Sequence, residues 1–359
     1  MFRTASITAA SARTSRRTGL LARAAQAPRL SVRPSFPLRS FAESSLFSAM
    51  PRAAGVLPAF DDIRAATRTL TNRSCNPEHA TMQERIRASL NEKNTFDRYV
   101  PALNRMLEYI GLDAKRSPAM CSIILGTLVD DRPLDAIEKH IYGMLQQTIV
   151  DPISNCNFID AIGPKLAGRS QIIFSQIEPY LQDMRGREIL DFGAGNGLVM
   201  DEVRRRISAN TRGINVRPYG EGILQYDGKH APFTDGRFDC VIVTNVFHHE
   251  KNNQQCLDEV RRLLVPGGKL IVIETVPTGD TDDEARQDLG RTFLIDFTYN
   301  RLFNHADIPV PGTFETAEGW KKRFTNSGFG PLDVFEQLGF DQEIVPDWHV
   351  LYVTRKPGG

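Results

Sequence analysis

Three glycines alternate with other residues directly after an acidic residue, in the stretch "EILDFGAGNGLVMDEV" at residues 188–203. The pattern reads Asp191-x-Gly193-x-Gly195-x-Gly197 and lies between an apolar run and a helical pattern. Glycine lets the main chain approach a ligand where a side chain would collide, and the helix that follows presents free N–H groups at its start. Turns of this kind hold phosphates, dinucleotides or nucleosides.

The spacing of the glycines disfavours two of these ligands. A dinucleotide turn reads G-x-G-x-x-G/A, with a small last residue that allows close helix–strand packing, but counting from Gly193 puts the large Leu198 there. No Gly-Lys-Ser/Thr follows that would hold a triphosphate. An NAD-linked oxidoreductase is therefore a disfavoured alternative.

The segments around this turn alternate between strand and helix patterns. After about residue 166 the apolar runs are "REILDF", "FDCVIVTN", "KLIVIETV" and "WHVLYVTRK", with helical patterns between them. This alternation predicts an α/β fold with a doubly wound, mostly parallel sheet over 166–359. Residues 58–165 carry apolar residues at spacings of three and four, as in "NTFDRYVPALNRMLEYIG", and predict a helical N-terminal region.

Three segments in a fixed order carry a family resemblance: "ILDFGAGNG", then "DGKHAPFTDGRFDCVIVTNVFHH", then "LDEVRRLLVPGGKLIVIE". Together they resemble the class I S-adenosylmethionine-dependent methyltransferases, closest to the small-molecule subgroup. The resemblance covers residues 189–274 and implies a Rossmann-like methyltransferase fold, S-adenosyl-L-methionine as cofactor and methyl transfer as the activity.

The resemblance also implies roles for the glycine turn. Gly193, Gly195 and Gly197 would lie under the methionine and ribose portions of the cofactor. Asp191 would order the turn or meet the methionine amino group.

Further along the chain, the resemblance implies three more cofactor contacts. Asp227 would accept a hydrogen bond from the adenine amino group, and Gly228 would leave room for the ring. Asn245, at the end of "VIVTN", would lie beside the sulfonium through its backbone.

Two features depart from the family pattern. The family usually has an acidic residue at the end of the second strand, whereas "RGINVRPYGEG" offers Asn215. Because an amide has one acceptor oxygen and no charge, the ribose contact should weaken by about 1–2 kcal/mol, unless Glu221 substitutes from the loop. In addition, only about six residues separate "GINV" from "ILQYD", fewer than the dozen that a parallel crossover needs. We expect the usual helix to be missing there and the third strand to be short.

Two adjacent histidines, His248 and His249, follow the fourth strand in "NVFHHE". They stand at the edge where open α/β sheets bind ligands. If the methyl acceptor is a hydroxyl, a general base helps, and imidazole titrates near working pH. Either of the two is a candidate for that base; the alternative is that the pair only packs and hydrogen-bonds locally. No residues have metal-ligand spacing, so no metal is expected.

The segment after the fifth strand, "RTFLIDFTYNRLFNHADIPVPGTFETAEGWKKRF", is where the resemblance places the acceptor pocket. Apolar side chains there could line a partly apolar site, and polar ones could hold the acceptor; they are Phe293, Phe297, Leu302 and Phe303, and Asp296, Tyr299, Asn300 and His305. The alternative is a helix packed on the sheet with its polar residues solvated.

Charge is distributed unevenly along the chain. Residues 1–42 carry eight arginines and no acidic residue, so the remainder has 36 basic against 43 acidic residues, a net of −7. An acidic body disfavours nucleic acid as a partner. The five cysteines form no CxxC pair, which indicates a reducing compartment. No uncharged apolar run approaches the ~18 residues of a membrane span.

The first 57 residues are rich in Ser, Arg and Pro and are expected to be a disordered leader. Their composition is typical of a mitochondrial transit peptide. The alternatives are a disordered basic tail, or a true start at Met50 that would leave a cytoplasmic protein.

These observations predict an S-adenosylmethionine-dependent methyltransferase that acts on a small, partly apolar acceptor. The helical region would cap the site or make an oligomer contact. The alternative is a non-catalytic methyltransferase-like protein that acts in assembly or binding.

Overall fold

The structure is a computed structural model that describes residues 61, 63–65, 81–149, 158–217, 220–304, 308–342 and 344–358. The expected leader (1–57) and His305 lie outside the described residues. Ser45–Gly359 form one compact unit by their contacts. Within the described part, no helix is long and apolar enough to cross a membrane.

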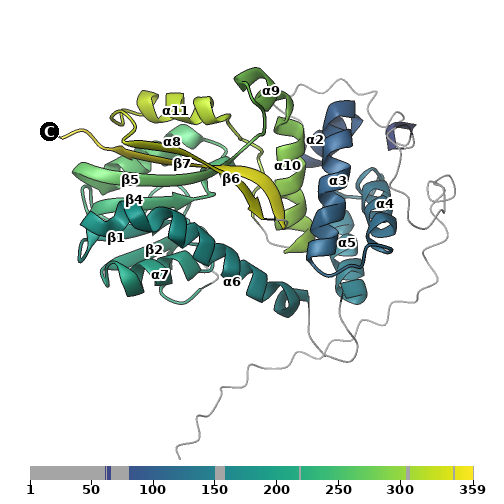
Figure 1. Ribbon diagram of the computed structural model, residues 1–359, viewed down its shortest axis with the longest axis horizontal. Coiled ribbons are helices and arrows are strands. Elements are labelled where there is room, and N and C mark those ends of the chain that lie inside the picture. The colour runs from purple at the N-terminus through teal and green to yellow at the C-terminus, as the bar shows by residue number, and fades with distance from the viewer. Residues whose placement is uncertain are drawn as a thin grey trace, which may run out of the picture. The chain divides into compact units, whose positions relative to one another are not determined.

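Helices precede the sheet in the chain (Figure 1). They are α2 (Met82–Asn91), α3 (Lys93–Tyr109), α4 (Ser117–Leu128), α5 (Leu134–Ile149), α6 (Phe158–Ile177) and the 3₁₀ helix η3 (Glu178–Met184). The start of α2 is fixed by a capping box, because Thr81 and Glu84 satisfy each other's backbone N–H groups. The boundary expected near residue 165 falls inside α6.

Seven strands form one sheet in the order β3-β2-β1-β4-β5-β7-β6. They are β1 (Ile189–Phe192), β2 (Thr211–Asn215), β3 (Ile223–Gln225), β4 (Phe238–Thr244), β5 (Leu264–Val276), β6 (Val334–Gln342) and β7 (Val345–Arg355). The first five run parallel, and β7 and β6 are antiparallel to their neighbours. The chain order reverses between β1 and β4, so the sheet is doubly wound and mostly parallel, as predicted.

Alternation along the strands explains why helices cover both faces of the sheet. Successive strand side chains point to opposite faces. Leu190 and Val241 pack with helices α8 (Asn253–Leu263) and α11 (Ala317–Asn326) on one face. Ile189 and Ile242 pack with α6 and α7 (Leu198–Arg206) on the other. Near-continuous apolar strands are typical of a sheet buried in this way.

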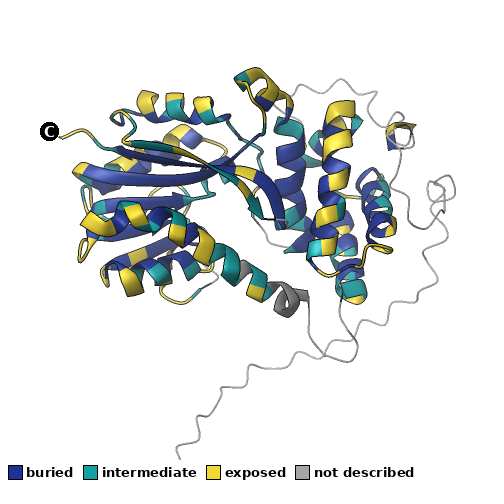
Figure 2. Ribbon diagram, viewed as in Figure 1, coloured by how far each residue is buried: buried dark blue, intermediate teal, exposed yellow. Residues whose placement is uncertain are grey.

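A third core joins the N-terminal helices to the segment after β5. This segment comprises α9 (Asp282–Gln287), α10 (Leu289–Phe297) and the π-helix η5 (Thr298–Phe303). Figure 2 shows α10 buried along most of its length. It packs with α3: the Tyr99 hydroxyl lies 2.6 Å from Thr298 Oγ1, and Gly290 is so close to Thr95 that an added Cβ would approach Thr95 Oγ1 to 2.7 Å.

The link between β2 and β3 is short, as the sequence predicted. β2 pairs parallel with β3, which has three residues, and no helix lies in the described part of residues 216–222. The main chain at Gly220 lies against the glycine turn, because a Cβ there would meet the Asn196 carbonyl oxygen at 2.3 Å. The link therefore crosses directly beside the turn.

Candidate functional site

The residues predicted to bind a ligand gather at one edge of the sheet. Asp191 lies in β1, Asn215 ends β2 and Asn245 directly follows β4. His248 and His249 lie in the 3₁₀ helix η4 (Phe247–His249) just beyond β4. Because β1 to β5 are parallel, their carboxyl ends share this edge, where open α/β sheets bind ligands.

The glycine turn has a backbone that only glycine adopts easily. Gly193, Gly195 and Gly197 have φ values of 84°, 53° and 81°. A Cβ on Gly193 would strike Val246 at 2.3 Å, so this glycine serves close packing. A Cβ on Gly195 would meet nothing nearer than the Gly193 carbonyl oxygen at 4.0 Å. Within the part of the chain that the structure describes, the bend at Gly195 is therefore not covered by side chains.

Asp191 is buried beside this bend without a hydrogen-bonding partner. It is 1% exposed, and neither carboxylate oxygen has a hydrogen bond within the described residues. Burial raises its pKa to about 7, although the Met200 backbone amide opposes the shift. An unsatisfied buried carboxylate is costly, so this group is suited to a donor or cation supplied by a ligand. The contact from the Met200 backbone amide to the Asp191 carboxylate is compatible with the alternative role, ordering the turn.

The next two strands place an amide and a carboxylate at the same edge. The side-chain Nδ2 of Asn215 donates to the Arg217 carbonyl, so Asn215 Oδ1 is the atom left to face a ribose. The exposed Asp227 accepts from the Lys229 and His230 backbone amides through Oδ1, each at 2.8 Å. These two bonds lower the pKa of Asp227.

The hydrogen bonds in the turn at Asp227 determine which of its carboxylate oxygens can contact a ligand. Since Oδ1 is engaged, the expected contact with an adenine amino group falls to Oδ2. Gly228 follows with φ 79°, and a Cβ there would lie 3.3 Å from Val216.

Asn245 is the one described non-glycine residue with a positive φ, at 55°. Such backbone costs free energy and often marks functional sites. Its amide donates to the Ile273 carbonyl at 2.8 Å. Its side-chain Oδ1 accepts from the Thr275 hydroxyl at 3.1 Å, and Thr275 Oγ1 lies 3.0 Å from Nε2 of His349. Two neighbouring strands thus hold Asn245 in place.

His248 is a buried imidazole held by a buried carboxylate. Its Nδ1–H donates to Oε2 of Glu274 at 2.6 Å, and its ring stacks on Phe314 with centroids 4.7 Å apart. Oε1 of Glu274 accepts from the Val246 and Phe247 amides at 3.0 and 2.7 Å. Glu274 therefore fixes both the loop after β4 and the orientation of the ring.

Charge keeps His248 protonated at neutral pH. Burial alone would lower its pKa, but the Glu274 and Asp296 carboxylates raise the pKa to about 10. His248 is thus an imidazolium rather than a free base near pH 7.

This ion pair makes the stability of the fold depend on pH. The folded-state pKa of His248 lies above its ordinary value of 6.5, so the pair stabilises fully below about pH 6.5 and the contribution is lost as pH rises towards 10. We expect His248→Gln to lower the free energy of unfolding most at pH 6 and least at pH 10, as measured by urea unfolding. A loss that is equal at both pH values would contradict the ion pair.

His249 has the opposite protonation. Its Nδ1–H donates to the Pro309 carbonyl at 2.9 Å, which leaves Nε2 as the free nitrogen. Burial, and then the charge of His248, lower its pKa. Nε2 of His249 lies 3.9 Å from Oδ1 of Asp296, and Nε2 of His248 lies 3.7 Å from the same oxygen. The two rings therefore converge on one carboxylate, with the free nitrogen on His249.

Sequence reasoning missed two residues of this edge, Glu274 and His349. Glu274 is the acidic residue near the end of an apolar strand, and an acidic residue at that position could have been predicted to belong to the site. His349 left no signal, because it lies near the start of β7 and reaches this edge only because β7 runs antiparallel to β5. Asp296, named only as a polar residue of the acceptor segment, comes to the histidines from α10.

The apolar residues of the expected acceptor segment lie in a core. Phe293, Phe297, Leu302 and Phe303 are buried in the cluster shared with the N-terminal helices. The alternative, a helix on the sheet with solvated polar residues, differs from this arrangement: the apolar side chains pack against the N-terminal helices, and Asp296 is buried and faces the histidines.

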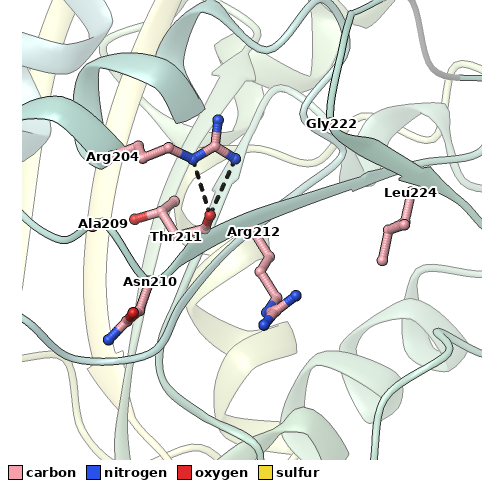
Figure 3. A pocket seen from close by; sticks show the side chains of 7 residues that line it. All are labelled: Arg204, Ala209, Asn210, Thr211, Arg212, Gly222 and Leu224. Carbon is pink, nitrogen blue, oxygen red and sulfur yellow. Dashed lines mark hydrogen bonds between the residues drawn. The ribbon is translucent and has the colours of Figure 1, made fainter.

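A hollow of about 260 Å³ lies elsewhere on the sheet. Figure 3 shows its lining at the β2–β3 edge, where the Arg204 guanidinium donates to the Thr211 carbonyl. Thr211 begins β2, so this hollow is at the end of the strand opposite to Asn215 and is separate from the ligand edge.

The doubly wound sheet, the bare glycine turn and the strained residue after β4 define an α/β protein with a ligand site at its carboxyl edge. Comparison with known proteins specifies the class. The family model described as "Methyltransferase domain" matches residues 190–272, which include the glycine turn and both histidines. Residues 190–272 of this chain are therefore a methyltransferase domain of the class I S-adenosylmethionine-dependent family, and S-adenosylmethionine is the cofactor of that family.

Individual relatives match parts of the chain. The demethylmenaquinone methyltransferase of Thermus thermophilus is 36% identical over 92 residues, covering 26% of this chain and 38% of that protein. The sterol 4-C-methyltransferase strm-1 of Caenorhabditis elegans is 24% identical over 206 residues, covering 52% and 60%. The chain spans less than two thirds of each of these curated relatives.

Among solved structures, a SAM-dependent methyltransferase from Methanosarcina mazei is similar with a TM-score of 0.38 and 17% identity. The match covers 51% of this chain and 98% of that chain.

Proposed function

We propose that this protein transfers a methyl group from S-adenosylmethionine to a small, partly apolar acceptor. One observation carries the proposal: among the described residues no side chain covers the main chain at Gly195, and the nearby buried carboxylate of Asp191 accepts no hydrogen bond from a side chain. A bare bend accepts a nucleoside against the backbone, and the carboxylate suits the ammonium of its methionine portion.

The chain's own residues account for the rest of the cofactor. Asn215 Oδ1 would accept from the ribose, and Asp227 Oδ2 from the adenine amino group. Asn245 would present its backbone at the sulfonium. When bound, the cofactor supplies a methyl group already activated by positive sulfur, so the protein has mainly to orient the two reactants.

The two histidines differ in what they can do for the acceptor. Nε2 of His249 is unprotonated and can take a proton from an acceptor hydroxyl. The His248 imidazolium, anchored by Glu274, lies 3.7 Å from Oδ1 of Asp296 and partly offsets the charge of that carboxylate beside the acceptor. Phe314, stacked on His248, supplies an apolar surface for a partly apolar acceptor. The relatives named above are named for a sterol and for demethylmenaquinone.

The titration of Asp191 makes cofactor binding depend on pH. Its pKa of about 7 means that below pH 7 binding of an ammonium must first release a proton, so affinity falls by up to tenfold per pH unit. We expect the affinity for S-adenosylhomocysteine to rise from pH 5.5 to 8 and then level off, measured by calorimetric titration. In Asp191→Asn the affinity should be weaker and nearly independent of pH. An unchanged pH dependence in that variant would contradict the role.

The proposed function is tested by binding and then by turnover. Calorimetric titration of the full chain with S-adenosylmethionine and S-adenosylhomocysteine should give one binding event per chain. Release of S-adenosylhomocysteine should then be measured against a panel of small hydroxyl, amine and carbon-acid acceptors. Absence of binding heat would refute the proposal.

A non-catalytic role in assembly or binding is the second candidate. Two observations favour it: Asn215 offers no charge to the ribose, and the β2–β3 link crosses beside the turn at Asn196. Normal binding without turnover against any acceptor would support this candidate over the first.

We also propose that residues 1–57 direct the protein to mitochondria. The support is their composition, which is rich in arginine and free of acidic residues up to Glu43. A fusion of residues 1–57 to a fluorescent protein should co-localise with a mitochondrial marker. Diffuse cytoplasmic fluorescence would refute it.

A further inference from the structure

One oxygen of a buried carboxylate near the histidines has no partner. Asp296 of α10 is 8% exposed. Its Oδ1 accepts from Nδ2 of Asn300 at 2.7 Å, but its Oδ2 has no hydrogen bond among the described residues. Leaving a buried carboxylate oxygen unsatisfied is costly, so the site is suited to a donor from outside the chain.

The nitrogens around Asp296 are already oriented towards it. The Nδ1–H groups of His248 and His249 are taken by Glu274 and the Pro309 carbonyl. Their Nε2 atoms therefore face Asp296, at 3.7 and 3.9 Å from Oδ1. The His249 side chain keeps 18% of its surface exposed, so the group is open to a ligand on that side.

The spacing fits a hydrogen-bonding atom better than a tetrahedral zinc ion. The three side chains could each offer one ligand atom, and these atoms lie within 4.8 Å of one another. Tetrahedral ligands at about 2.1 Å from zinc stand about 3.4 Å apart, which is closer than the 3.7 and 3.9 Å seen here. Oδ1 of Asp296 and Nε2 of His249 are 3.9 Å apart. A ligand oxygen or nitrogen can therefore lie about 2.8 Å from both atoms without any movement of the two side chains.

The net charge of the side chains around Asp296 indicates which class of ligand the site binds. Asp296 and Glu274 are two buried carboxylates with one imidazolium, His248, between them. The nearby Arg169 is matched by Asp341 at 2.6 Å. The region thus carries an excess of negative charge, which repels an anionic ligand and attracts a cation in low dielectric.

We propose that Asp296 and His249 form an acceptor subsite that takes a hydroxyl or a protonated amine and rejects a carboxylate. The inference rests on the proposed function, because it names the chemical class of the methyl acceptor. A protonated amine has enough hydrogens to donate to both the Asp296 carboxylate and His249 Nε2, and it gives one proton to His249 before it can accept a methyl group. A hydroxyl has a single hydrogen and donates it to one of these two acceptors at a time.

The test measures binding of three probes of similar size and different charge. Phenol, benzylamine and benzoate are titrated by NMR into the full chain, with and without S-adenosylhomocysteine. We expect phenol and benzylamine to bind at least about tenfold more tightly than benzoate. Asp296→Asn should reduce the preference for benzylamine over benzoate by about tenfold, while Asp296→Glu, which keeps the charge, retains it.

A matched control separates charge at this site from charge in general. Asp347 is also buried with an oxygen that lacks a partner, but it pairs with Arg291 at 2.7 Å. Asp347→Asn should leave the probe preference unchanged. If Asp296→Asn does not fold, His249→Gln removes the second partner and should weaken phenol binding.

Three results would overturn the proposal. They are equal binding of the three probes, a preference that survives in Asp296→Asn, and stoichiometric Zn²⁺ binding that is lost in Asp296→Asn, which would make this a metal site. Failure of S-adenosylhomocysteine to bind would contradict only the proposed function, because the probe titrations are also made without S-adenosylhomocysteine.

Discussion

Gly195→Val should weaken the binding of S-adenosylhomocysteine by at least about 100-fold, equivalent to about 3 kcal/mol. Among the described residues, and apart from its two chain neighbours, a Cβ at this position meets no atom closer than 4.0 Å, so valine would extend into the space that the ligand needs. The φ of 53° adds strain for a β-branched residue. The measurement is calorimetric titration of the purified variant.

A second glycine controls for that strain. Gly186, in the exposed turn before β1, has φ 71° and no atom within 4 Å of an added Cβ. Gly186→Val should cost stability in the same way and leave ligand affinity unchanged. Full affinity in Gly195→Val would remove the bend from the ligand site.

His249→Gln should lower kcat by about 10²–10⁴-fold, the range typical for loss of a general base. The variant keeps a polar side chain but loses the unprotonated Nε2 that faces Asp296. The affinity for S-adenosylhomocysteine should not change, because His249 lies on the acceptor side. The readout is release of S-adenosylhomocysteine with the best acceptor from the panel, and His140→Gln in α5 serves as the matched control.

The pH profile distinguishes the two histidines. If His249 is the base, kcat should be flat near pH 7–8 and fall only at a pH below 6.5, because burial and the charge of His248 lower the pKa of His249 from its ordinary value of 6.5. If His248 is the base, kcat should keep rising towards pH 10, where its pKa lies. A rise of that kind, with little loss in His249→Gln, would transfer the role to His248.

Local patterns predicted the cofactor half of the molecule well. The alternation of apolar runs predicted β1, β4, β5 and β7, and the six-residue link predicted the short β3. These features depend on near neighbours in the chain, where period and turn chemistry are informative. The resemblance of three segments to one family then located the residues from Asp191 to Asn245 at the ends of the strands.

The region around His248 and Asp296 depends on contacts between residues that are far apart in the sequence, and sequence patterns do not predict such contacts. The edge strand β6, with its partly exposed sequence "VFEQLGFDQ", has no clear alternation and was not predicted. His349 reaches Thr275 only through the antiparallel pairing of β7 with β5. Asp296 meets His248 because a π-helix and α3 fix the end of α10. The spacing of residues within a short stretch of the sequence does not predict such contacts between distant residues.

The shared core of α10 and the N-terminal helices has an evolutionary consequence. The helix that carries Asp296 is covered by α3 through Tyr99 and Thr95, while the glycine turn packs within the sheet. Mutations that accumulate in the N-terminal helices would shift Asp296 and retune which compounds are accepted, yet leave donor recognition intact. If Asp296 belongs to the proposed acceptor subsite, descendants of this protein can diversify in substrate through the helices that pack on α10.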